Sequence, residues 1–174
     1  MGKRGLGECA PGLPSAGRIV RCGCVNGKAM AGWLIPQGFQ LTGVDGARAM
    51  IEGARENFPD QRCLLQDMRQ LSLGETFDGL IAWDSFFHLT QDDQKQMFTR
   101  FEQHSHAGSV LMFTSGPEEG EAFGQMEGET LYHASLAPQT YRALLAEINF
   151  EVVDVVLNDP HCTGHSVWLA QRKA

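Results

Sequence analysis

The chain has 174 residues, of which 43% are hydrophobic, and it carries a formal net charge of −7 at pH 7. This length and apolar content fit one domain with a single sizeable core. The negative charge and the lack of a basic run argue against nucleic acid as the main partner, because neutralising phosphates requires clustered Lys and Arg. No apolar stretch approaches the roughly 20 residues of a membrane-spanning helix, so we expect a soluble protein.

The N-terminal segment, residues 1–17, is rich in Gly and Pro and lacks an apolar period. We expect a loose leader there and a single domain over residues 18–174. The leader also lacks the apolar region of a secretory signal. The five cysteines are an odd number without a repeated CxxC spacing, which indicates reduced thiols and a cytoplasmic location. We interpret Cys22 and Cys24 as small buried hydrophobes rather than as a metal pair.

The first predicted elements form the outline of a nucleotide-binding unit. A strand over Arg18–Cys22 leads into a turn that contains Gly23 and Gly27, and a helix follows over Lys28–Ile35. A second strand then ends at Asp45. Glycines allow a tight turn and close approach to a ligand, and an acid at the second strand end can accept both hydroxyls of a ribose. These features predict a cofactor site, although Asp45 could instead only cap the next helix.

Strands and helices continue to alternate along the chain. Helices are expected over 47–57, 91–104 and 138–148, and strands over 62–66, 77–83, 109–115, 150–157 and 167–170. Thr90 and Pro138 are predicted to begin the second and third of these helices. Residues 116–137 are expected to be a long connection that serves as a lid or mobile segment. The alternation predicts an α/β fold with a doubly wound, three-layer sheet, closed by an antiparallel hairpin.

Acidic residues recur at the ends of three predicted strands. Asp45, Asp67 and Asp84 each follow an apolar run. The carboxyl ends of parallel strands meet at one edge of a sheet, which is where open α/β sheets bind their ligands. The sequence therefore predicts that the ligand lies at this edge.

Five segments carry a family resemblance: the first turn from Gly23 to Gly27, TGVDGARAMIEGAREN around Asp45, LLQDM at the third strand, FDGLIAWDSFFHL at the fourth, and NFEVV before the closing hairpin. Their order and spacing between Gly17 and Arg172 resemble the class I S-adenosylmethionine-dependent methyltransferases, in particular the small bacterial methyltransferase-domain group. The resemblance implies a Rossmann-like sheet of seven strands whose last strand runs antiparallel between its neighbours. It also implies S-adenosyl-L-methionine as cofactor and a small-molecule acceptor, with monomer or homodimer left open.

The resemblance further implies roles for single residues. Asp45 resembles the acid that binds the ribose hydroxyls, and Asp67 with Met68 resembles the pair beside the adenine. Trp83 and Asp84 would lie near the methionine end of the cofactor, where an aromatic face or a carboxylate can stabilise the cationic sulfonium.

Histidines are the candidates for proton transfer. Alignment does most of the work in methyl transfer, and a base is needed only if the acceptor has a proton to lose. His88 is the first candidate and His133 the second, with a structural role as the alternative for each. His161 and His165, which flank Cys162, are interpreted as a solvated turn rather than a metal cluster, and no metal is expected.

The first turn departs from the family pattern. Arg21 and Val25 stand where the family usually has an acid and a glycine, and the segment before the first strand is short. A guanidinium would repel the amino group and the sulfonium of the cofactor. A non-catalytic protein of this fold that has lost the cofactor is therefore the alternative function. A nicotinamide-dinucleotide oxidoreductase fits less well, because the turn lacks the G-x-G-x-x-G spacing.

Overall fold

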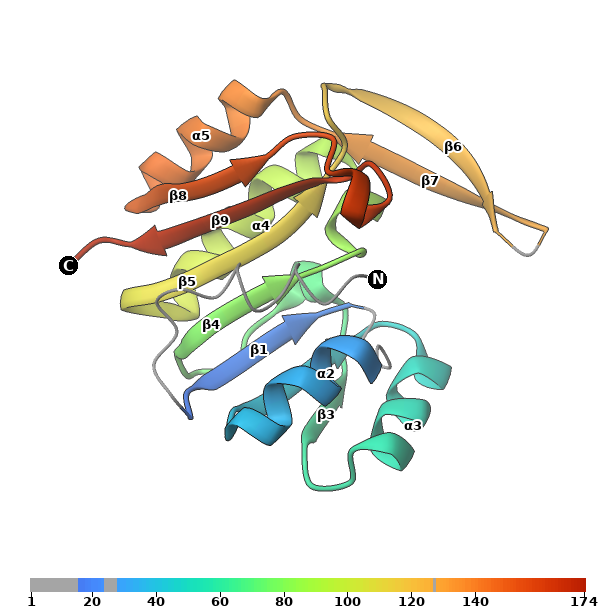
Figure 1. The fold of residues 1–174 in the computed structure, drawn as a ribbon, viewed down its shortest axis with the longest axis vertical. Coiled ribbons are helices and arrows are strands. Elements are labelled where there is room, and N and C mark those ends of the chain that lie inside the picture. Colours follow the sequence, from blue (N-terminus) through green and yellow to red (C-terminus); the bar gives the residue numbers. More distant parts are fainter. Residues whose placement is uncertain (1–15, 24–27, 127) are drawn as a thin grey trace.

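The computed structural model describes residues 16–23, 28–126 and 128–174, and its main feature is a twisted sheet (Figure 1). Among the described residues, seven strands form this sheet in the order β3-β2-β1-β4-β5-β9-β8. The last strand, β9, runs antiparallel to both of its neighbours, and the other pairings of the sheet are parallel. The predicted Rossmann-like sheet and its closing hairpin are confirmed.

The elements follow the predicted order closely. The strands of the sheet are β1 (Arg18–Cys22), β2 (Gln40–Asp45), β3 (Arg62–Leu65), β4 (Phe77–Ala82), β5 (Ser105–Ser115), β8 (Phe150–Val156) and β9 (Ser166–Arg172). The described helices are α2 (Lys28–Leu34), α3 (Arg48–Asn57), α4 (Gln91–Gln103) and α5 (Pro138–Glu147), with short 3-10 turns η1 (Ile35–Gln37), η2 (Met68–Gln70), η3 (Phe86–His88) and η4 (Pro160–Cys162). Only β5 begins clearly earlier than expected, because it pairs with the start of β4 before its register shifts.

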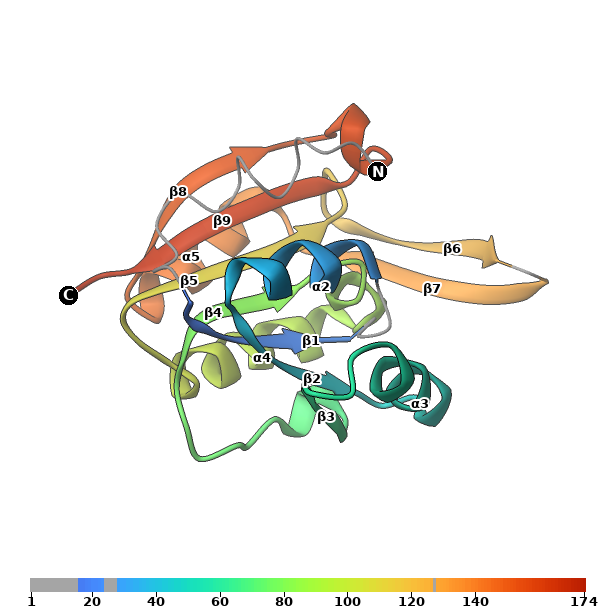
Figure 2. The same cartoon turned by 60° about the horizontal axis from the view of Figure 1, so that its bottom comes forward.

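Helices cover both faces of the sheet, which gives the three layers (Figure 2). On one face, α2 packs on an apolar cluster that includes Ile19, Met112 and Leu169. On the other face, α4 and α5 cover a larger cluster, in which Phe113 stacks on Trp168 with ring centroids 5.7 Å apart. Burial of these side chains on both faces provides the main stabilisation of the domain.

Local capping chemistry sets the predicted helix ends. The Thr90 hydroxyl accepts a hydrogen bond from the backbone N–H of Asp93 at 3.1 Å and so begins α4. Pro138 occupies the first position of α5, where its missing N–H is not needed. Gly38 ends the segment after α2 with a left-handed φ of 90°. The predicted starts at Thr90 and Pro138 are confirmed.

Residues 116–137, which were expected to be a long connection, contain two strands that the sequence analysis did not predict. After a short loop, this segment forms an antiparallel hairpin of β6 (Gly120–Met126) and β7 (Glu129–Ser135), which projects from the carboxyl edge of the sheet (Figure 1). The ends of the hairpin are held by the pairs Gly120–Ser135 and Met126–Glu129. The abundant Gly and Glu concealed this pattern, because they disfavour strands in isolation and are tolerated on an exposed two-stranded sheet.

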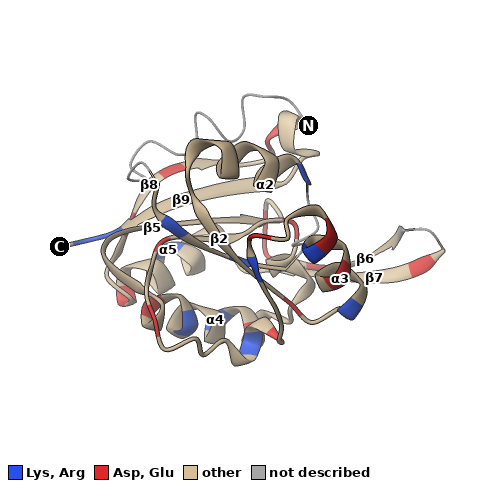
Figure 3. Cartoon of the chain, turned by 90° about the horizontal axis from the view of Figure 1, so that it is seen from below, with Lys and Arg blue, Asp and Glu red and all other residues tan. Residues whose placement is uncertain are grey.

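Charged residues lie mainly outside the sheet (Figure 3). Residues of both signs alternate along α3 and α4, whereas the strands carry few charges. Within the described part of the chain, no helix is long and apolar enough to cross a membrane.

Candidate functional site

The carboxyl edge of the sheet brings together the ends of strands that are distant in sequence. The strand order reverses between β1 and β4, which is the point where open α/β sheets bind ligands. Because β9 is antiparallel, its first residue, Ser166, pairs with Ser115 at the end of β5. The turn before β9 therefore lies at the same edge as the ends of the parallel strands.

Gly23 lies at the switch point, directly after β1, and has a left-handed φ of 78°. Its N–H donates to the carbonyl of Val44 at 2.8 Å. A Cβ at this position would come within 2.3 Å of the Ser85 Cβ and 2.9 Å of the Met68 Cε. Both the conformation and the close approach therefore require glycine. Gly27, Val25 and the rest of this turn lie outside the described residues.

Asp45 ends β2 at this edge and is buried, with 8% of its surface exposed. Its Oδ1 accepts the N–H of Ala47 at 2.8 Å, and Ala47 is the residue that begins α3. Of the two carboxylate oxygens of Asp45, only Oδ1 accepts a hydrogen bond from another described residue. The carboxylate can therefore support the start of α3 through Oδ1 and present Oδ2 to a ligand.

Asp67 and Met68 follow β3, at the next position along the edge. Both carboxylate oxygens of Asp67 accept hydrogen bonds from the Arg69 guanidinium, the shortest at 2.6 Å. These bonds hold the pKa of the Asp67 carboxyl below its usual value. The Met68 methyl group lies beside Gly23, where the absence of a side chain leaves room for it. Met68 is thus close to the first turn, whereas Asp67 is bound by a neighbouring side chain.

Trp83 and Asp84 follow β4 and differ in their surroundings. Trp83 is buried in the apolar cluster beneath α2. Asp84 has a left-handed φ of 49°, and its N–H donates to the Thr114 hydroxyl at 2.9 Å. This bond fixes the turn after β4, and the Asp84 side chain is half exposed at the carboxyl edge.

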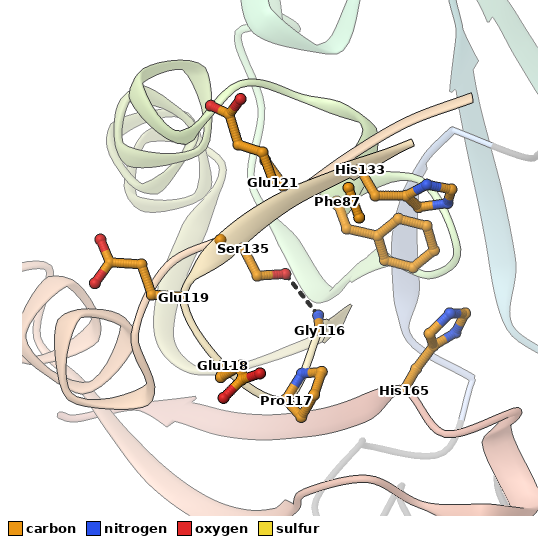
Figure 4. A pocket seen from close by; sticks show the side chains of 12 residues that line it. Phe87, Gly116, Pro117, Glu118, Glu119, Glu121, His133, Ser135 and His165 are labelled. Carbon is orange, nitrogen blue, oxygen red and sulfur yellow. Dashed lines mark hydrogen bonds between the residues drawn. The ribbon is translucent and has the colours of Figure 1, made fainter. Parts of the chain in front are cut away.

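A cavity of about 440 Å³ opens beside Asp84, between the sheet and the hairpin (Figure 4). Its walls are Phe87 from η3, residues 116–122, His133–Ser135 of β7, and His165 from the turn before β9. The Ser135 hydroxyl accepts the N–H of Gly116 at 2.7 Å and ties the hairpin to the end of β5. The volume suits a small molecule.

Three imidazoles surround the Phe87 ring. The ring centroids of His88, His133 and His165 lie 4.8, 5.2 and 4.7 Å from that of Phe87. Figure 4 shows His133 next to Phe87, and His165 pointing toward it from the opposite side. Burial lowers the pKa of His133, and the neighbouring His88 lowers it further. His133 is therefore a neutral imidazole at pH 7.

The two predicted histidines have different positions. His133 lines the cavity, but His88 is not among the lining residues. The Nδ1 of His88 lies 2.9 Å from the carbonyl oxygen of Tyr132 and donates to it, so His88 connects η3 to the hairpin. The rings of His88 and His133 are 4.7 Å apart, which brings the two candidates together as one cluster.

His165 lies in the turn before β9, as predicted, but it also has a place in the cavity that the sequence did not indicate. Its side chain is 31% exposed, it lines the cavity, and its Nδ1 lies 3.4 Å from Oδ1 of Asp84. His161, in the same turn, is exposed. The predicted antiparallel strand could have revealed His165, because it places the residue before that strand at the ligand edge.

Arg21 lies on the face of β1 that α2 and α3 cover. It is buried, with 5% of its surface exposed. It borders a space of about 20 Å³ whose other walls include the small residues Ala31, Gly43 and Ala54. These small residues make room for the long side chain.

Cys22, the residue after Arg21, is buried against the opposite face of the sheet. Burial raises the pKa of its thiol to about 12, as expected for a small core residue. Cys24 lies outside the described residues.

Several solved structures of similar fold are methyltransferases. The chain is similar to an S-adenosylmethionine-dependent methyltransferase from Clostridium acetobutylicum (TM-score 0.73, 15% identity, covering 90% of this chain and 84% of that one). It is also similar to an amino pentose methyltransferase from Micromonospora echinaspora involved in calicheamicin biosynthesis (TM-score 0.75, 18% identity, 96% and 88% covered). A third is the CcbJ methyltransferase from Streptomyces caelestis (TM-score 0.74, 16% identity, 93% and 86% covered).

Comparison with curated protein sequences finds no match. A family of methyltransferase domains does match the sequence over residues 19–108, from β1 into β5, which is more than half of the chain. This match includes the predicted cofactor edge. The protein belongs to the methyltransferase domain family.

Proposed function

We propose that this protein transfers a methyl group from S-adenosyl-L-methionine to a small-molecule acceptor. The observation that carries the proposal is the cavity of about 440 Å³, which opens directly beside the carboxyl edge of the sheet. The methyltransferases of similar fold, one of them solved with S-adenosylmethionine bound, support the choice of cofactor. When bound, S-adenosylmethionine supplies an activated methyl group and a neutral thioether leaving group.

The residues at the edge fit this cofactor. Gly23 provides a backbone without a Cβ at the switch point, and Oδ2 of Asp45 is available to accept a ribose hydroxyl. Met68, beside Gly23, offers a thioether to an adenine face. Asp67, Trp83 and Asp84 are included in the proposed cofactor site from their positions after the strand ends, and Gly27 is included from the sequence of the first turn.

The cluster of His88 and His133 would accept a proton from the methyl acceptor. His133 faces the cavity and is neutral at pH 7, so its free lone pair can accept a proton. His88 donates its Nδ1–H to Tyr132, which leaves Nε2 as the basic atom, and its ring lies against His133. Phe87 forms an apolar wall that excludes water and orients the acceptor.

Ligand binding is the most direct test. We expect S-adenosylhomocysteine to raise the thermal unfolding midpoint, because a ligand that binds only the native state stabilises it by mass action. NAD, as the control, should leave the midpoint unchanged. A shift with NAD and none with S-adenosylhomocysteine would replace this proposal with an oxidoreductase.

Two observations favour the alternative, a protein of this fold that has lost the cofactor. Arg21 stands where the family resemblance implies an acid, and both carboxylate oxygens of Asp67 accept hydrogen bonds from Arg69. Under this alternative, neither ligand shifts the midpoint. The double substitution Arg21→Asp with Val25→Gly should then strengthen S-adenosylmethionine binding in calorimetric titration. Micromolar binding by the unmodified protein would contradict the alternative.

The proposed partner is a small molecule rather than a nucleic acid, since the net charge of −7 would oppose a phosphate backbone. We infer a cytoplasmic location from the cysteines. Among the described residues, Cys22 and Cys63 form no disulfide, and thiols of this kind are typical of a reducing compartment.

A further inference from the structure

We infer that His165 is the proton acceptor of this site and that Asp84 is the residue that positions it. The inference rests on the proposed function and names a group that the sequence did not indicate. His165 lines the cavity from the turn before β9, and Asp84 follows β4 on the proposed cofactor side. The pair therefore joins the acceptor cavity to the cofactor edge.

The surroundings of His165 select one tautomer of its ring. Its Nδ1 lies 3.4 Å from Oδ1 of Asp84 and 3.4 Å from the hydroxyl oxygen of Thr163. The Thr163 hydroxyl already donates its hydrogen to the carbonyl of Cys162 at 2.7 Å, so its oxygen can only accept from His165. Both neighbours of Nδ1 are thus acceptors, which places the proton on Nδ1 and the lone pair on Nε2. Contacts of this length commonly shorten when a site is filled.

The backbone holds Asp84 in place for this contact. Its left-handed φ of 49° is uncommon for a residue other than glycine, and its N–H is bonded to Thr114 on β5. Asp84 and His165 are distant in sequence and meet because β9 begins where β5 ends. Asp84 is close enough to stabilise an imidazolium on His165 once a proton has been accepted.

The other two imidazoles are less suited to this role. The ring of His88 does not line the cavity, and burial together with the neighbouring imidazoles lowers the pKa of His133. In the proposed step, the bond between hydrogen and the acceptor's nitrogen or oxygen breaks, and a bond between that hydrogen and Nε2 of His165 forms. The electron pair stays on the acceptor atom. With S-adenosylmethionine bound, that pair would form the new bond to the methyl group, and the electron pair of the broken carbon–sulfur bond would leave with S-adenosylhomocysteine. The acceptor is accordingly an amine or a hydroxyl compound.

The test combines a spectroscopic and a chemical readout on the full chain. The imidazole nitrogen chemical shifts of the unmodified protein should show His165 protonated at Nδ1 near neutral pH. Diethyl pyrocarbonate, which attacks an accessible neutral imidazole nitrogen, should modify His165 faster than the exposed His161 of the same turn. Asp84→Asn, an exchange suited to a left-handed backbone, should slow modification of His165 several-fold and leave His161 unchanged.

Experiments with S-adenosylhomocysteine test the proposed function and the role of His165 separately. Binding of S-adenosylhomocysteine is measured by calorimetry, and this ligand should slow modification of His165 but not of His161. Absence of binding would overturn the proposed function and the role of His165 together. Binding combined with an Nε2-protonated His165, or with modification rates that Asp84→Asn leaves unchanged, would overturn the role of His165 alone. The tautomer is measured on the unmodified protein and so does not depend on how the variant folds.

Discussion

Substitution of Asp45 tests the proposed cofactor site directly, because the two carboxylate oxygens of this residue have different proposed roles. Oδ1 accepts the N–H of Ala47 at 2.8 Å, and Oδ2 remains for a ligand. In Asp45→Asn, the amide oxygen can still accept the Ala47 N–H, but the second atom becomes an NH2 group that donates. We therefore expect the variant to keep its fold and to bind S-adenosylhomocysteine more weakly.

The size of this effect follows from the number of bonds lost. Only one carboxylate oxygen is available, so the loss corresponds to one hydrogen bond to a charged group, about 1.5–3 kcal/mol. At about 1.4 kcal/mol for each factor of ten, the dissociation constant should rise about 10- to 150-fold. Asp45→Ala should weaken binding similarly and also destabilise the fold by about 1 kcal/mol, because the Ala47 N–H loses its acceptor.

Calorimetric titration and urea unfolding of both variants measure the two effects separately. Unchanged affinity in Asp45→Asn would refute the assignment of Oδ2 to the ligand. Equal destabilisation by Asn and Ala would refute the role of Oδ1 at the start of α3. An affinity loss confined to Asp45→Ala would show that the packing of α3, and not the carboxylate, determines binding.

Three further predictions concern the stability of the fold. Gly23→Ala should lower the free energy of unfolding, measured by urea titration, by about 2–5 kcal/mol, because alanine would be strained in the left-handed conformation and would clash with Ser85. A change near zero would contradict this packing. Tyr141→Phe should lower the free energy of unfolding by about 1–3 kcal/mol, because the buried Oε1 of Gln94 loses the hydroxyl that donates to it at 2.6 Å. A variant as stable as the wild type would show that this hydrogen bond is dispensable. The pKa of Asp67 is lower in the folded protein than its unfolded value of 3.8, so its contribution is present above pH 3.8 and is lost as the pH falls through the folded pKa. Asp67→Asn should therefore flatten the stability profile below pH 3.8, and a profile parallel to the wild type would rule out this contribution.

The sequence determined the sheet and the positions of its acids. Apolar runs such as Phe77–Ala82 and capping residues such as Thr90 act within a few residues of themselves, so their effects can be predicted without the tertiary structure. The hairpin of residues 120–135 was missed because its strands carry Gly and Glu, and their pairing outweighs weak local preference. Strands of this kind are hard to predict from sequence wherever contacts between strands outweigh the local strand propensity of their residues.

Only the tertiary structure decided which side chains contact one another at the carboxyl edge of the sheet. In the tertiary structure, Arg21 lies against α2 and α3, and Asp67 accepts hydrogen bonds from Arg69. His165 lies next to Asp84. Each of these outcomes depends on strand order and register, which bring together side chains from distant parts of the chain. The sequence alone therefore predicted the edge where a ligand would bind. The tertiary structure decided which groups face the cavity: most come from the β6–β7 hairpin and the loop before it, and His165 reaches the cavity because β9 enters between β5 and β8.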